Sequence, residues 1–410
     1  MSTLHRSIVG AMTIVLLGMA ASNPSAADGR AGLDPVTQNM LATLGARLAQ
    51  GPQTEGLLFF SSAERRVAFG HIDLLYPTRT VVAGPEPYPL AERPEDFSNL
   101  TYEVDGERHA LADFLARPEA IGLIVVKDGD ILLEHYAPDN DRASRWISFS
   151  VTKSVTSMLI GAAIADGFID SVDEPVAHYL PRLRGTPYEA SRIRDVLNMA
   201  SGVAWNEDYA DPQSDVARAG GANGVQLVRY LAALPRQHQP GEVFNYNTGE
   251  TNLVGEILRA AIGNNAATYL SHKVWQPFGM ESDATWLTSA PGAGEAGGCC
   301  ISATLRDYAR LGIFAMNDGV LPDGRRVLPE GWMQASVEPS SGSAGYGYLW
   351  WLPGDEAFAA RGIFSQQIFI DPAQALVIAA HGNAPTATGS EYARHLAAVT
   401  DALRGVIRAR

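Results

Sequence analysis

Residues 148–167 read SFSVTKSVTSMLIGAAIADG, and this stretch decides how the rest of the chain is interpreted. After Ser150 the apolar residues recur at intervals of three and four, which predicts a helix with one apolar face. Asp166-Gly167 predicts its end. Ser150 and Lys153 lie three positions apart, so one helical turn places the hydroxyl and the amine side by side. At a helix start, unpaired N–H groups can also stabilise a developing oxyanion.

Strand patterns precede and follow this helix. Residues 122–126 are wholly apolar, and an Asp-Gly turn at residues 127–130 leads into residues 131–135, which predicts a hairpin. Residues 390–407 have the spacing of an amphipathic helix capped by Ser390, which can cover a sheet. Further strands are predicted at residues 346–351, 367–370 and 375–380.

The segment between these strands is helical in pattern. Helices are expected at residues 193–199, 225–233, 249–261, 266–275 and 304–315. We therefore predict an α+β fold, an α/β/α sandwich whose mainly antiparallel sheet is built from both chain ends and flanked by helices, with an inserted all-helical lobe. The α/β domain would comprise residues 28–160 and 295–410, and the helical domain residues 161–294. Residues 28–115 carry few clear patterns, and Gly292–Gly298 is interpreted as a flexible approach to the next helix.

The composition restricts the possible functions. The chain has 410 residues, of which 46% are hydrophobic and 19% charged, as expected of a folded protein with a large core. Its formal net charge is −14, and no dense run of Lys or Arg occurs. Most of the surface would repel a polyanion, so a nucleic-acid partner is not expected.

The N-terminus has the pattern of a signal peptide. His5 and Arg6 precede an apolar stretch from Ile8 to Ala20, and Ser25-Ala26-Ala27 suits cleavage before Asp28. We therefore predict that residues 1–27 are removed on export to the periplasm or the medium, which leaves no membrane attachment. The apolar stretch is too short for a bilayer about 30 Å thick, although an uncleaved anchor is the alternative.

Other catalytic patterns have little support in the sequence. Cys299 and Cys300 are adjacent, and a bridge between neighbours closes a strained ring, so buried packing of free thiols is expected. The nine histidines form no His-x-x-x-His or His-Glu-x-x-His pair, which gives no support for a zinc site. No Gly-x-Ser-x-Gly turn occurs. We expect no metal or organic cofactor.

The Ser-x-x-Lys pair suits nucleophilic catalysis. A serine needs a base to take its proton, and a buried lysine can do so in its neutral form, whereas arginine stays protonated. The chain holds only three lysines, Lys127, Lys153 and Lys273. Chance is the alternative, because roughly one chain in five would show this spacing by accident. The position of Ser150 at the start of an amphipathic helix favours the catalytic interpretation.

Several further segments, which follow one another in the order of a known family, strengthen the catalytic interpretation of Ser150 and Lys153. Residues 148–157 resemble the active-site helix of class C serine β-lactamases and the penicillin-binding-protein-like hydrolases. The resemblance extends over about residues 120–405 and implies the β-lactamase/transpeptidase-like fold. The other matching segments are IRDVLNMASG at 193–202, PGEVFNYNT at 240–248, FGME at 278–281 and residues 346–351.

The resemblance implies roles for further residues. Tyr246 would stand beside Ser150 and Lys153 and relay protons between them and the leaving group. The backbone N–H groups of Ser150 and Ile363 would form the oxyanion hole, and Gly362 would let its strand approach the ligand closely. The alternative for Tyr246 is a packed aromatic residue, and for residues 360–363 a plain edge strand.

Two departures bear on the substrate. The family's Tyr-x-Asn motif reads Tyr246-Asn247-Thr248 here, and its Lys-Thr-Gly motif is matched by residues 360–362, Ala-Arg-Gly. The lysine that pairs with a β-lactam carboxylate is absent, although Arg361 could partly replace it. The loop at residues 205–217 is similar to that of the 6-aminohexanoate-dimer hydrolases, where Tyr209 would contact the substrate amide. The expected substrate-binding residues are Tyr209, Thr248, Arg361 and Gly362.

These observations predict a secreted serine hydrolase that cleaves a small-molecule amide or ester through an acyl-enzyme. A β-lactamase or D-alanyl-D-alanine carboxypeptidase is the alternative enzyme. A non-catalytic protein that binds cell-wall fragments is the alternative from another class, since a fold alone does not fix function.

Overall fold

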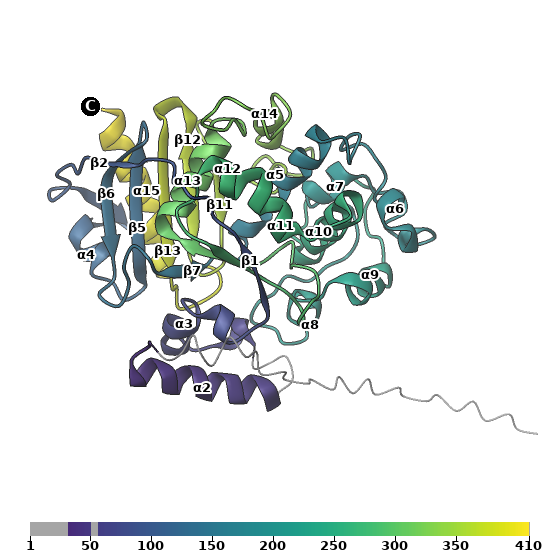
Figure 1. The fold of residues 1–410 in the computed structure, drawn as a ribbon, viewed down its shortest axis with the longest axis horizontal. Helices are drawn as coiled ribbons and strands as arrows, with labels where there is room; N and C mark the ends of the chain where they lie inside the picture. Colours follow the sequence, from purple (N-terminus) through teal and green to yellow (C-terminus); the bar gives the residue numbers. More distant parts are fainter. Residues whose placement is uncertain (1–31, 51–55, 410) are drawn as a thin grey trace, which may run out of the picture.

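The computed structural model describes residues 32–50 and 56–409 (Figure 1). The predicted signal segment, residues 1–27, lies outside these residues. The strands of the described chain are β1 Thr78–Val81, β2 Ala91–Glu92, β3 Thr101–Val104, β4 Glu107–Ala110, β5 Ala120–Lys127, β6 Asp130–Tyr136, β7 Arg145–Ile147, β8 Ala284–Leu287, β9 Ile301–Thr304, β10 Trp351–Gly354, β11 Ala357–Arg361, β12 Gln367–Asp371 and β13 Leu376–Gly382.

The helices are distributed along the whole described chain. They are α2 Pro35–Gln50, α3 Ser62–Ala68, α4 Leu111–Leu115, α5 Val151–Ala165, α6 Val176–Tyr179, α7 Ile193–Leu197, α8 Asp215–Ala219, α9 Gly224–Ala232, α10 Thr248–Ile262, α11 Ala266–Leu270, α12 Gln276–Phe278, α13 Leu305–Met316, α14 Trp332–Ser336 and α15 Glu391–Arg408. Within residues 32–50 and 56–409, none of them combines the length and the apolar character that crossing a membrane requires.

A seven-stranded sheet forms the centre of the fold. Its strand order is β10-β11-β12-β13-β5-β6-β2, so strands from both halves of the chain meet where β13 pairs with β5. The pairs are antiparallel except for β2 with β6. The predicted hairpin is β5 and β6, and Asp128 and Gly129 at its turn have φ of 53° and 86°. This topology agrees with the predicted α+β sheet built from both chain ends.

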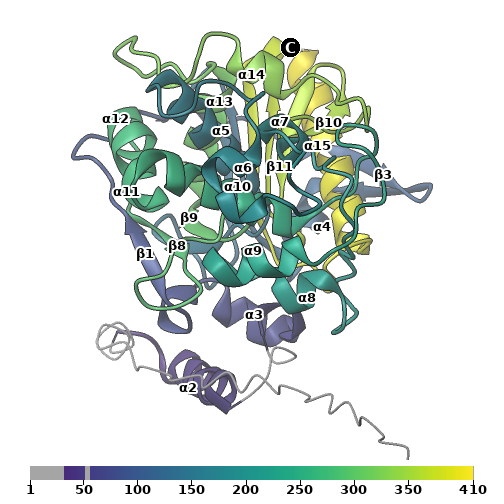
Figure 2. The same cartoon turned by 90° about the vertical axis from the view of Figure 1, so that its right-hand side faces the viewer.

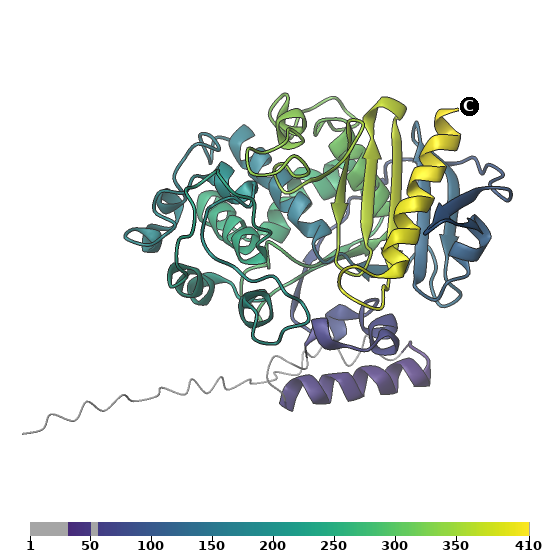
Figure 3. The same ribbon diagram turned by 180° about the vertical axis from the view of Figure 1, so that it is seen from behind.

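Alternating side chains of the sheet face two separate cores. On β5, Ile124 and Val126 pack with α5 and α13, whereas Leu123 and Val125 face the core that contains α15. Figure 3 shows α15 lying across this second face of the sheet. Burying an aliphatic side chain of this size stabilises the fold by about 1.5–3 kcal/mol. The result is the expected three-layer arrangement.

Helix α5 is more deeply buried than its sequence pattern predicts. Of its 15 residues 13 are buried, so the predicted single apolar face describes only part of its surroundings. A Cβ at Gly161 would lie 2.7 Å from the Trp332 ring, which shows how closely α14 approaches. The helix therefore holds Ser150 and Lys153 at the centre of the molecule.

The inserted region carries most of the shorter helices. Helices α6 to α10 lie together beside the sheet (Figures 1 and 2). One strand, β8, falls within residues 161–294, which we expected to be wholly helical, and it joins a second sheet of order β1-β8-β9-β7. The division of the chain at residues 160 and 294 stays a prediction.

Residues 28–115, which carry few clear sequence patterns, contain α2, α3 and the β3-β4 hairpin within their described part, residues 32–50 and 56–115. Two local expectations were wrong. The strand predicted at residues 346–351 does not form before Trp351: Tyr346 makes an isolated bridge with Trp351, and residues 347–349 are bends, with Leu349 at φ of 62°. Gly297 and Gly298, which we expected to belong to a flexible segment, are buried against α10 and α5. They are packed so closely that a side chain at either position would collide with its neighbours.

The two cysteines also differ from expectation. The structure places Cys299 and Cys300 in a disulfide across a cis peptide bond, with Cα atoms 3.2 Å apart, and not as free thiols. A bridge between adjacent residues links no separate elements, so the hydrophobic cores hold the fold together.

Candidate active site

Ser150 lies directly before α5, at the N-cap position, where its side chain makes no capping hydrogen bond. The preceding residue, Phe149, has a left-handed backbone with φ of 45°, which is uncommon for a bulky side chain. Its ring makes edge contacts with Phe69 and Phe364, with centroid separations of 5.0 and 5.1 Å. This packing maintains the unusual turn that presents Ser150 at the start of the helix.

Lys153 lies one turn further along α5, with only 1% of its surface exposed. Its Nζ donates to the Thr248 hydroxyl at 3.0 Å and to the Gly298 carbonyl at 2.9 Å. Burial lowers the pKa of Lys153 to about 8, and the Glu207 carboxylate partly opposes this effect. Part of the amine is therefore neutral near pH 7, as a general base requires.

Tyr246 comes from the segment just before α10, which is capped by the next residue, Asn247. Its ring stacks on Trp351 at a centroid separation of 5.5 Å and meets Tyr346 edge-on at 6.0 Å. The Nζ of Lys153 lies 5.5 Å from the centre of the Tyr246 ring. Aromatic packing therefore fixes this phenol beside the amine.

The phenol of Tyr246 also interacts with the Ser150 side chain. Burial and the Glu207 charge raise the pKa of Tyr246, and the hydrogen bond with Ser150 acts in the opposite direction. The phenol therefore keeps its proton near pH 7. The structure thus brings Ser150, Lys153 and Tyr246 together, and their catalytic roles stay predictions.

The predicted oxyanion donors lie where two segments meet. Just beyond β11, Gly362 N donates to Gln366 O at 2.8 Å, and Phe364 N donates to Gln366 Oε1 at 3.2 Å. Between these two, the N–H of Ile363 has no hydrogen-bond partner among the described residues, and neither has the N–H of Ser150. Both groups are therefore available to an anionic oxygen.

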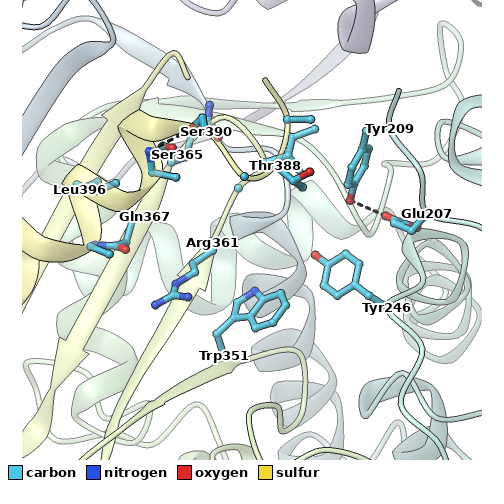
Figure 4. Close-up of a pocket in the computed structure, with 17 residues that line it drawn as sticks. Glu207, Tyr209, Tyr246, Trp351, Arg361, Ser365, Gln367, Thr388, Ser390 and Leu396 are labelled. Carbon is cyan, nitrogen blue, oxygen red and sulfur yellow. Dashed lines mark hydrogen bonds between the residues drawn. The ribbon is translucent and has the colours of Figure 1, made fainter. Parts of the chain in front are cut away.

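A cavity of about 480 Å³ opens beside Tyr246. Figure 4 shows Glu207, Tyr209 and Tyr246 on one side of it and Trp351 and Arg361 on another. Gly362 and Ile363 belong to the cavity wall, whereas Ser150, which is 8% exposed, does not. Tyr246 is therefore the member of the predicted catalytic group that lines the cavity.

A sequence model of the Beta-lactamase family matches residues 108–402, which is most of the chain. The chain belongs to the Beta-lactamase family. This result confirms the resemblance in the sequence and the fold class that it implied. It also makes the protein a member of a hydrolase family.

The proteins to which this chain is similar include hydrolases. The 6-aminohexanoate-dimer hydrolase of Paenarthrobacter ureafaciens is 30% identical over 277 residues, which cover 61% of this chain and 69% of that protein. A candidate 6-aminohexanoate-dimer hydrolase from Bacillus anthracis shares the fold with a TM-score of 0.72 at 22% identity, over 83% of this chain and 93% of the other. A family VIII carboxylesterase matches with a TM-score of 0.55 at 17% identity, over 72% and 96% of the two chains.

The substrate-binding residues expected in this Beta-lactamase family member lie in different places. Tyr209, Arg361 and Gly362 line the cavity. Thr248 does not line the cavity. Its hydroxyl instead accepts a hydrogen bond from Lys153 and donates one to Glu207. Within the described residues, no group of three His, Cys, Asp or Glu side chains could hold a metal ion.

Glu207 is a residue of this Beta-lactamase family site that the sequence analysis missed. Its carboxylate lines the cavity and accepts hydrogen bonds from Tyr209 OH at 2.6 Å, from Thr248 N at 3.0 Å, and from the Thr248 hydroxyl and Trp205 Nε1. The available signal was its place in the loop that carries Tyr209. An isolated acidic residue in a polar loop gives no indication by itself.

Proposed function

We propose that the protein is a serine hydrolase that cleaves an amide or ester bond of a small molecule through an acyl-enzyme. The observation that carries the proposal is geometric: the buried amine of Lys153 lies one helical turn after Ser150 and 5.5 Å from the centre of the Tyr246 ring. Membership of a hydrolase family supports the same conclusion.

In the proposed first step, Ser150 Oγ attacks the substrate carbonyl carbon while the neutral amine of Lys153 takes the hydroxyl proton. The N–H groups of Ser150 and Ile363 stabilise the oxyanion. Tyr246, which keeps its proton, donates it to the leaving amine or alkoxide and regains a proton from Lys153. Water then attacks the acyl-enzyme with the same groups in reverse roles.

The cavity favours substrates other than a β-lactam. Residue 360, which matches the family's lysine, is alanine, and its side chain belongs to the core on the α5 side of the sheet. The aromatic walls formed by Tyr209 and Trp351 suit an extended organic chain. We therefore propose an amidase or esterase similar to the 6-aminohexanoate-dimer hydrolases.

We extend the proposal to the location of the enzyme. Residues 1–27 would act as a signal peptide cleaved before Asp28, which places the mature enzyme in the periplasm or the medium.

A fluorophosphonate probe tests the proposed nucleophile. The wild-type protein is expected to be labelled at Ser150, with the site identified by mass spectrometry of peptides, because an activated serine reacts with the probe. Ser150→Ala should remain folded and unlabelled. A folded wild-type protein that takes up no label, or takes it up elsewhere, would reject the proposed function.

The pH profile gives a second test. We expect kcat/KM for p-nitrophenyl acetate to rise with pH and level off above a midpoint near 8, since the neutral Lys153 amine is the base and burial lowers its pKa to about 8. At pH 6 only about 1% of such an amine is neutral, so the rate should be about 100-fold below the plateau. A flat profile from pH 6 to pH 9 would contradict this assignment.

Arg361 is expected to select anionic substrates. Its side chain is exposed at the cavity and forms no ion pair among the residues that the structure describes. Arg361→Met should lower kcat/KM about 10-fold or more for an ester whose acyl chain ends in a carboxylate, because a charge-assisted hydrogen bond contributes about 1.5–3 kcal/mol. The neutral ester of equal length is the control and should change little. An equal loss with both esters would show that Arg361 does not recognise the charge.

A further inference from the structure

A chain of two hydrogen bonds joins Lys153 to a carboxylate. The amine donates to Thr248 Oγ1 at 3.0 Å, and the same hydroxyl donates to Glu207 Oε1. Thr248 is the first residue of α10, and Lys153 belongs to α5, two helices that pack against each other. The hydroxyl therefore connects the two charged groups across a helix interface.

Hydrogen bonds to both of its oxygens hold the Glu207 carboxylate in place. Oε1 also accepts from the Tyr209 phenol at 2.6 Å, and Oε2 accepts from Thr248 N at 3.0 Å and from Trp205 Nε1. Each oxygen thus accepts two hydrogen bonds, which is the capacity of its lone pairs. Although Glu207 lines the cavity, its oxygens are already engaged, so it is suited to act as a fixed charge and not as a base.

The groups around Glu207 bear on how its charge reaches the Lys153 amine. The phenols of Tyr209, Tyr246 and Tyr346 also face Glu207, and their pKa values are raised by burial and by its charge, so they stay neutral near pH 7. Among the described residues, Glu207 is the charged group that acts on the Lys153 amine against the effect of burial. An opposite charge at this range favours the protonated amine.

We propose that Glu207 is a positioning residue that, through the Thr248 hydroxyl, orients the Lys153 amine and sets its charge. Burial lowers the pKa of the amine, and the charge of Glu207 acts in the opposite direction. The balance lets Lys153 take a proton from Ser150 and retain it until the leaving group needs it. The catalytic meaning of this balance rests on the proposed function.

Direct titration of Lys153 tests the proposal without any assay of activity. The chain has three lysines, so labelling lysine with ¹³C at Cε gives three NMR signals, and Lys153→Met assigns the one of interest. In Glu207→Gln the Lys153 amine is expected to titrate about one pH unit or more below its wild-type midpoint. An unchanged midpoint in this folded variant would overturn the proposal.

Glu256→Gln is the matched control. Glu256 lies on α10, two turns beyond Thr248, and accepts from Gly224 N and Arg259, away from Lys153. The substitution Glu256→Gln removes one glutamate charge and should leave the titration midpoint of Lys153 unchanged. A shift as large as that of Glu207→Gln would show a non-specific effect of net charge and would also overturn the proposal.

Glu207→Asp provides a second test in case Glu207→Gln does not fold. The shorter side chain keeps the charge but withdraws it from Thr248, so the midpoint should fall by less than in Glu207→Gln and still lie below that of the wild type. A wild-type midpoint in folded Glu207→Asp would reject the proposal if Glu207→Gln does not fold. A shift in the titration of a protein that takes no fluorophosphonate label would leave this inference intact and reject only the hydrolase function.

Discussion

Replacing Lys153 with methionine is expected to lower kcat/KM for a p-nitrophenyl ester by about 10³-fold, since the proton of Ser150 then lacks an acceptor. Methionine has a similar length, so the buried site should stay filled. The substitution leaves the Gly298 carbonyl and the Thr248 hydroxyl without their donor, which costs some stability. Steady-state kinetics and thermal unfolding of the same preparation separate these two effects.

Lys127→Met is the matched control for this prediction. Lys127 lies at the end of β5, where it contacts Asp128 on the surface, and its loss should leave the kinetics unchanged. The residual activity of Lys153→Met should also lose the rise with pH near 8, because the titrating amine is gone. A variant that keeps more than about a tenth of the wild-type rate would show that another group acts as the base.

The elements that could be predicted from the sequence are those with strong local signals. The hairpin of β5 and β6 has an Asp-Gly turn, and α15 has both a serine cap and a regular apolar stripe. By contrast, α3 begins with a capping box of Ser61 and Glu64 that the sequence analysis did not use, and residues 347–349 bend where a strand was predicted. Strand β8 was missed because it is only four residues long and lies among helices.

The candidate site divides in the same way. Ser150, Lys153 and Tyr246 could be found because each lies in a motif with family resemblance, and the structure brings them together. The left-handed backbone of Phe149 depends on packing against rings that are remote in the sequence. Gly298 could not be recognised as a contact of Lys153, since its role is to leave space for the amine: a Cβ there would lie 2.9 Å from Nζ.

The second large effect is expected from Gly362→Ala. A Cβ at residue 362 would lie 2.5 Å from the Ser148 carbonyl oxygen and 2.5 Å from Gln366 Oε1. The first of these is backbone directly before the active-site helix, so the end of β11 must move away from it. That movement carries the N–H of Ile363 away from the oxyanion, and loss of one such donor lowers kcat by about 10²–10³-fold.

The kinetic signature distinguishes this cause from a blocked cavity. The Ile363 N–H is proposed to stabilise charge that develops in the transition state, so kcat should fall far more than KM rises. Gly405→Ala is the control, because a Cβ at that position in α15 has no neighbour within 4 Å, and its kinetics should match those of the wild type. If Gly362→Ala instead raises KM and preserves kcat, the added methyl group obstructs substrate binding, and the oxyanion donor must be sought elsewhere.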